Sequence, residues 1–143
     1  MYLTRNPRVV VKERDARDAG WDLFAEVTQG GLTVGKSFAI EVKARLSLPP
    51  GARPVFGGSV YLPPSSLKFT RRERLVAENI NFPLCLFFFT MSNDKGYAAW
   101  LKAPDLSTPG RRLVSPPDVL KLEPLNSKRV NSLIDEVDRW YSF

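Results

Sequence analysis

An almost perfect alternation of apolar and polar residues from 37 to 48 constrains the fold of this chain most. The apolar positions of this run are Phe38, Ile40, Val42, Ala44, Leu46 and Leu48. Period two over such a length predicts a β-strand that is buried on one face. Residues 21–27 indicate a second strand, and the glycines between residues 28 and 35 predict a turn that joins the two strands into a hairpin.

The turn sets which residues of this hairpin face each other. With its centre between Gly31 and Leu32, one face is wholly apolar and pairs Trp21 with Val42, Leu23 with Ile40 and Ala25 with Phe38. The other face has Asp22 opposite Glu41, Glu26 opposite Ser37, and Lys43 beside Glu41. A slip of one residue would mix the two faces, so burial of apolar side chains selects this register.

The charged face of the hairpin has two interpretations. Directly opposed residues have Cβ atoms roughly 4.5 to 5.5 Å apart, so Asp22 and Glu41 repel each other unless a cation lies between them. Magnesium binds one or two carboxylates together with waters and phosphate oxygens, and it fits such a gap. The alternative is a solvated face on which Lys43 neutralises both acids.

Missing residue types exclude several kinds of chemistry. The chain has no histidine, which excludes Ser-His-Asp and Cys-His nucleophile sites, histidine acid–base catalysis and histidine-ligated zinc. Its one cysteine, Cys85, lies in an apolar run, where a buried and inert thiol is expected; a single cysteine forms neither an internal disulfide nor a thiolate zinc site. Carboxylates, amines, hydroxyls and an oxygen-bound metal remain.

Length, charge and hydropathy set broad expectations. The 143 residues suit one domain, residues 1–143, and a net charge of +6 weakly favours polyanionic partners. No apolar run is long enough to span a bilayer, and the N-terminus has no apolar segment typical of a signal peptide. We therefore expect a cytoplasmic protein without a membrane partner.

Further elements follow from local patterns. Residues 8–13 could open the sheet, and residues 84–91 and 97–101 are expected to be strands. The spacing of Thr70 and Glu73 predicts a capping box that starts a helix ending near Asn79. A C-terminal amphipathic helix is expected at about 127–141, with one apolar face formed by Val130, Leu133, Ile134, Val137, Trp140 and Tyr141. Proline-rich loops are expected at 49–66 and 104–124.

The order of these motifs resembles a known family. Asp18-Ala19-Gly20-Trp21-Asp22, followed by a turn and then Glu41-Val42-Lys43, resembles the PD-(D/E)xK, or restriction-endonuclease-like, nuclease superfamily. It looks most like a bacterial family of uncharacterised domains within that superfamily. The motifs of that family are matched here by Gly35-Lys36-Ser37-Phe38, by Pro83 leading the apolar run to Phe89, and by Tyr97-Ala98-Ala99-Trp100.

The resemblance implies an α/β fold, a mixed sheet flanked by helices, and a nuclease acting on nucleic acid, with DNA expected. Asp22, Glu41 and the Val42 carbonyl would hold magnesium or manganese, and Lys43 would orient the nucleophile or offset charge on the phosphate. Asp18 and Glu26 would support these ligands. Basic side chains that could hold the nucleic-acid backbone are Lys36, Arg45, Lys68, Arg71, Arg72 and Arg74.

One departure from the family supports a second hypothesis. Many members have a helix before the first catalytic strand that donates a glutamate, but Pro7 and the β-branched residues 9–11 argue against a helix here, and Glu13 is the one candidate substitute. A non-catalytic module that binds nucleic acid or protein is therefore the alternative. The aromatic end, residues 140–143, could dock on a partner or on a second copy, or could simply cap the core.

A phosphate-binding-loop pattern spans residues 30–37, Gly-Gly-Leu-Thr-Val-Gly-Lys-Ser. That mechanism needs a helix that starts at the Lys-Ser end, so that its amides cradle phosphate. Here Ser37 begins the alternating run, which predicts a strand. A nucleotide hydrolase is therefore not expected.

Overall fold

The computed structural model describes residues 6–13, 22–115 and 119–142, with the backbone alone at Glu13 and Arg72. Its strands are β1 (Val9–Glu13), β2 (Leu23–Gln29), β3 (Leu32–Arg45), β4 (Arg53–Pro54), β5 (Val60–Leu62), β6 (Leu84–Thr90), β7 (Lys95–Pro104), β8 (Leu113–Val114) and β9 (Leu120–Pro124). Its helices are the 3-10 helix η1 (Pro64–Leu67) and the α-helices α1 (Arg71–Asn79) and α2 (Ser127–Ser142).

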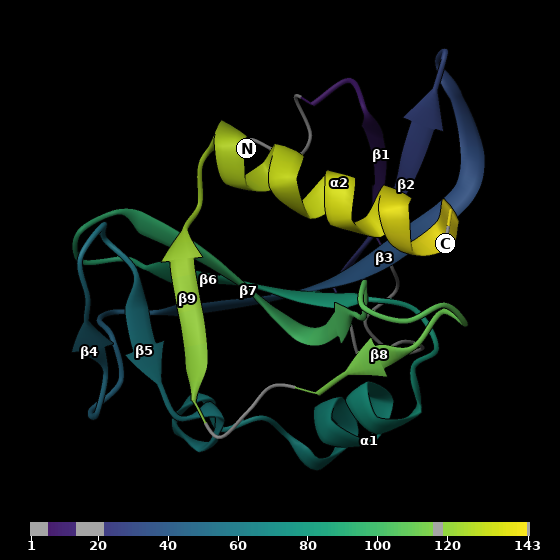
Figure 1. Cartoon of the computed structure of the whole chain (residues 1–143). Helices are drawn as coiled ribbons and strands as arrows, with labels where there is room; N and C mark the ends of the chain where they lie inside the picture. The colour runs from purple at the N-terminus through teal and green to yellow at the C-terminus, as the bar shows by residue number, and fades with distance from the viewer. Residues whose placement is uncertain (1–5, 14–21, 116–118, 143) are drawn as a thin grey trace.

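The strands form one open, mostly antiparallel sheet in the order β1-β2-β3-β6-β7-β9-β5-β4, with β8 paired to β7 (Figure 1). Strands β3 and β6 pair in parallel, and α1 lies in the connection between them. A parallel pair needs such a crossover, because a tight turn can join only antiparallel strands. The chain is a mixed α/β single domain.

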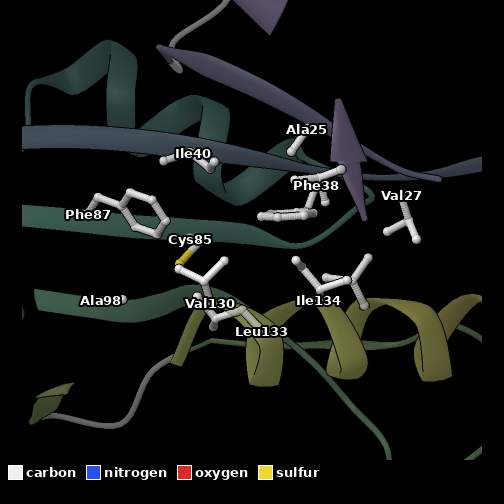
Figure 2. Close-up of a cluster of buried hydrophobic side chains, with 12 residues drawn as sticks. Ala25, Val27, Phe38, Ile40, Cys85, Phe87, Ala98, Val130, Leu133 and Ile134 are labelled. Carbon is white, nitrogen blue, oxygen red and sulfur yellow. The ribbon is translucent and has the colours of Figure 1, made fainter. Parts of the chain in front are cut away.

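Helix α2 covers one face of the sheet. Its apolar stripe (Val130, Leu133, Ile134, Val137) packs on Phe38 and Ile40 of β3 and on Cys85 and Phe87 of β6 (Figure 2). These side chains are 0–1% exposed, and Trp140 of the same stripe is 1% exposed. The predicted amphipathic helix and the buried Cys85 are thus confirmed, and Trp140 belongs to the core.

The opposite face is covered as well. Ala39 of β3 and Leu84, Leu86 and Phe88 of β6 form a second buried cluster there, against which Ala77 of α1 packs. Figure 1 shows α1 and α2 on opposite sides of the sheet. Because side chains alternate along a strand, Glu41 and Lys43 lie on the α1 side. The interpretation as a solvated hairpin face is wrong for Glu41, which is 8% exposed.

The predicted hairpin register is confirmed near the charged residues. Leu23 pairs with Ile40, Ala25 with Phe38 and Glu26 with Ser37. The turn itself was misplaced by one residue: Gln29 pairs with Leu32, so Gly30 and Gly31 form it, both with positive φ. A bulge restores the register, because residues 34–36 lie opposite the single residue Val27, and Gly35 adopts φ 75° there.

The two proline-rich stretches were expected to be loops throughout, but each contains short strands. Residues 49–66 include β4, β5 and the start of η1, and residues 104–124 include β8 and β9. Strand β9 bridges β7 and β5, with Leu120 and Leu122 at most 3% exposed. Each of these strands is at most five residues long, so the alternation is too short to be recognised beside the prolines.

Other local predictions are confirmed. Residues 9–13 form an edge strand, and residues 84–90 and 95–104 form β6 and β7. Helix α1 begins with the predicted capping box of Thr70 and Glu73. In the described part of the chain, no helix combines the length and apolar character that crossing a bilayer requires.

Candidate functional site

The site begins where β3 extends beyond the end of β2. Asp22 lies just before β2; its N–H donates to the Ile40 carbonyl at 3.0 Å, and its Oδ2 accepts from the Val42 N–H at 2.7 Å. The Asp22 carboxylate is therefore fixed against the edge of β3 at Val42, next to Glu41. The Val42 carbonyl points to this same edge, because the N–H and C=O of one strand residue face the same neighbour.

Glu41 and Lys43 project together from β3 toward α1. The Lys43 ammonium lies 2.9 Å from Oε2 and 3.2 Å from Oε1 of Glu73, and 5.0 Å from the centre of the Phe69 ring. The Lys43 and Glu73 side chains are only 11% and 15% exposed. A half-buried ion pair of this kind has little conformational freedom, so Lys43 is held in a defined position.

Glu73 is the site residue that the sequence interpretation missed. It lies in the first turn of α1, where its Oε1 accepts from the Thr70 N–H at 2.9 Å and its own N–H donates to Thr70 Oγ1 at 3.1 Å. One carboxylate thus caps the helix and also binds Lys43. The signal was present as the capping-box spacing, but that spacing was interpreted as a helix start alone.

The two glutamates have opposite pKa shifts. Burial, a hydrogen bond to Glu73 and the negative charges of Asp22 and Glu73 raise the pKa of Glu41 to about 9. Burial also acts to raise the pKa of Glu73, but hydrogen bonds with Glu41, Thr70 and Lys43 outweigh it and lower that pKa to about 2. Without a metal, the two glutamates therefore share one proton at neutral pH.

A cavity of about 680 Å³ opens beside this cluster, with Glu41 and Glu73 in its wall. Three cationic side chains line the same wall: Lys68 follows η1, Arg74 lies on α1, and Lys102 lies on β7. Lys102 Nζ donates to Ser115 Oγ at 2.8 Å. The cavity therefore joins a buried acid to several basic groups.

The other predicted residues are distributed more widely. Lys36 lies on the opposite face of the sheet, where its ammonium is 2.7 Å from Asp138 Oδ1 on α2 and 3.0 Å from Ser142 Oγ. Glu26 faces Lys12 of β1, with 3.4 Å between Nζ and Oε1. Neither side chain joins the cluster around Glu41.

Two of the predicted basic side chains line the cavity, Lys68 and Arg74. Arg45 is exposed at the end of β3, donating to the Ala44 carbonyl at 2.9 Å, and Arg71 is exposed at the first position of α1. Asp18, Trp21, Phe143 and the side chains of Glu13 and Arg72 lie outside the described residues.

The donor chemistry fits a hard divalent cation. Asp22, Glu41 and the Val42 carbonyl offer oxygen atoms alone, as magnesium prefers. Among the described residues, no set of three or more histidine, cysteine, aspartate or glutamate side chains is arranged to hold a metal. An ion here would therefore take two carboxylates from the protein and complete its coordination with backbone, water or phosphate oxygens.

Comparisons with protein-family models, with curated proteins and with solved structures gave no match to this chain.

Proposed function

We propose that this protein is a metal-dependent nuclease that hydrolyses phosphodiester bonds of nucleic acid, with DNA as the expected substrate. The observation that carries the proposal is the convergence of Asp22, Glu41 and Lys43: two segments bring two carboxylates and an ammonium together beside a cavity with basic side chains. That combination supplies a metal ligand set and a group for the phosphate.

Asp22, Glu41 and the Val42 carbonyl would hold magnesium or manganese. When bound, such an ion binds the phosphate and lowers the pKa of its water, which makes hydroxide available. Lys43 would donate from its ammonium to the attacking water or to a phosphate oxygen. Glu73 accepts from Lys43 and so fixes where that ammonium lies, while Lys43 retains further N–H donors for the substrate.

The fold within the α/β class is proposed to be restriction-endonuclease-like. Support comes from the meander β1-β2-β3, which carries Asp22 and Glu41, followed by the crossover helix α1 and the parallel strand β6. This agrees with the mixed sheet flanked by helices that the resemblance implies. Residues 9–13 form strand β1 and not the N-terminal helix that many family members have, as their β-branched side chains indicated, and Glu73 of α1 brings a glutamate to the site instead.

The alternative is a non-catalytic module that binds nucleic acid or protein. Two contacts favour it. Glu41, the more buried of the two proposed carboxylate ligands, is already hydrogen-bonded to Glu73, and Lys43 is already paired with Glu73. In that case the same cluster would stabilise the domain and the basic side chains alone would act.

The deciding experiment is incubation of the pure protein with plasmid, single-stranded DNA and RNA in magnesium or manganese. Asp22→Asn and Lys43→Ala should abolish cleavage, whereas Glu26→Gln, which changes an acid outside the cluster, should retain it. Cleavage that survives both of the first two changes would refute the proposed site. Binding without cleavage of any substrate would favour the module.

A further inference from the structure

The cavity beside Glu41 is large enough for part of a substrate and too small for a duplex. Its volume is about 680 Å³, within the roughly 300–1,000 Å³ of pockets that enclose small molecules. One nucleotide falls in this size range, whereas a double helix with its bases paired is too wide to enter a cavity of this volume. Glu41 is only 8% exposed and lies in the cavity wall, so a single nucleic-acid strand could reach it through the cavity.

The wall of the cavity has the composition that a nucleobase requires. Apolar surface comes from the η1–α1 stretch, through Pro63, Phe69 and Ala77, and from β7, through Leu101. Single-stranded nucleic acid is commonly bound by aromatic and apolar side chains that contact the face of a base. Enzymes that carry out chemistry on a base within a duplex reach it by turning its nucleotide out of the helix into such a pocket.

The charges of the wall suit the backbone on either side of that base. Lys43 neutralises Glu73. A bound metal ion or a proton would neutralise Glu41. Among the described lining residues, Glu78 then carries the one remaining negative charge, against the positive charges of Lys68, Arg74 and Lys102. These cations come from the connection between η1 and α1, from α1 and from β7, which places positive charge on more than one side of a bound nucleotide.

We propose that the substrate is presented to this site as an unpaired nucleotide, in a single strand or at an unpaired position of a duplex, with its base in the cavity and its flanking phosphates on Lys68, Arg74 and Lys102. This inference rests on the proposed nuclease function, since Glu41 is both the metal ligand and part of the cavity wall. It adds the conformation of the substrate, which the metal ligands alone leave open.

The test measures binding by fluorescence anisotropy in EDTA, so that no cleavage is needed. The probes are a single-stranded DNA of about 16 nucleotides, its perfect duplex, the duplex with one unpaired nucleotide, and that duplex with the unpaired base removed. We expect the first and third probes to bind about tenfold more tightly than the perfect duplex, and removal of the base to abolish the gain. Equal binding of all four probes would overturn the proposal.

Two variants of α1 give a matched comparison. Ala77→Phe fills the cavity and should remove the preference for unpaired probes, whereas Leu75→Phe, at an exposed position outside the cavity, should keep it. Circular dichroism checks that both variants fold. If Ala77→Phe does not fold, the duplex probe without the unpaired base still tests the proposal on the wild-type protein. A preserved preference without cleavage in magnesium would refute the catalytic role alone. Equal cleavage of paired and unpaired DNA would refute the substrate class alone.

Discussion

Glu73 of helix α1 forms an ion pair with Lys43 of strand β3, with 2.9 Å between Oε2 and Nζ. The helix that connects the parallel strands β3 and β6 therefore contributes a charged group to the candidate site as well as apolar surface to the core. This contact connects the hairpin to the first turn of α1 and to the cavity wall, so its removal should weaken how the helix is held on the sheet.

Glu73→Gln should destabilise the protein by about 1–3 kcal/mol, because it leaves the half-buried Lys43 ammonium without its counter-charge. Glutamine still satisfies the capping box, so the loss reports the ion pair rather than the helix cap. Urea unfolding at neutral pH measures the change. Glu78→Gln, an exposed position on the same helix, should change stability by less than about 0.5 kcal/mol. Equal effects of the two substitutions would contradict the contact.

Glu41 should make the metal-free protein less stable as the pH rises. The pKa of Glu41 is raised from 4.5 to about 9 in the folded state. Its favourable contribution to the free energy of unfolding is therefore complete below pH 4.5 and is lost as the pH rises toward 9. Glu41→Gln cannot ionise and should lose much less stability over this range. Thermal melts in EDTA between pH 5 and 9 should show a difference of more than about 1 kcal/mol between the two proteins.

The groups that face Glu41 define the control for this prediction. Asp22 and Glu73 disfavour its ionised form and Lys43 favours it. The Glu73 pKa is lowered to about 2, so Glu73 stabilises the folded protein above pH 4.5 and this stabilisation is lost on acidification. Below pH 4.5, the stability of Glu41→Gln should therefore change with pH as that of the wild type does. Parallel stability curves at pH 5–9 would mean that Glu41 is not the group that titrates.

The hairpin could be predicted because only one register places Leu23, Ala25, Phe38 and Ile40 together on the apolar face that packs into the core. Pairing of Leu23 with Ile40 and Ala25 with Phe38 follows from that condition, and it brings Asp22 beside Glu41. The position of the turn could not be predicted, since a bulge at Gly35 changes the register by a local backbone irregularity that leaves no periodic signal.

Glu73 and the short strands escaped prediction for a different reason. The capping box of α1 is a local pattern, whereas the contact of Glu73 with Lys43 joins residues thirty positions apart and depends on how α1 docks on the sheet. Strand β9 likewise becomes a strand by pairing with β7 and β5, and its own five residues carry too little alternation to indicate this.

Magnesium should stabilise the protein through Asp22 and Glu41. At a hundredfold excess over its dissociation constant, a ligand adds about 2.7 kcal/mol to the folded state. We expect thermal melts at pH 8 to show this gain in the wild type and in Glu26→Gln, and to lose it in Asp22→Asn and Glu41→Gln. Asparagine keeps an oxygen that can accept from the Val42 N–H, so loss of the gain reports the carboxylate charge. A gain that persists in both ligand variants would locate the ion elsewhere.

Two basic residues that the sequence ranked alike should behave differently. Arg74 lines the cavity, so Arg74→Gln should weaken binding of single-stranded DNA about equally for all sequences and reduce the slope of log K against log salt by about 0.7. Lys36 lies across the sheet in an ion pair with Asp138, with its side chain 19% exposed, so Lys36→Gln should leave DNA binding unchanged and lower stability by about 1 kcal/mol. Salt titrations of binding and urea unfolding of both variants separate the two effects. A large loss of binding in Lys36→Gln would mean that nucleic acid contacts the α2 face of the sheet, away from Glu41.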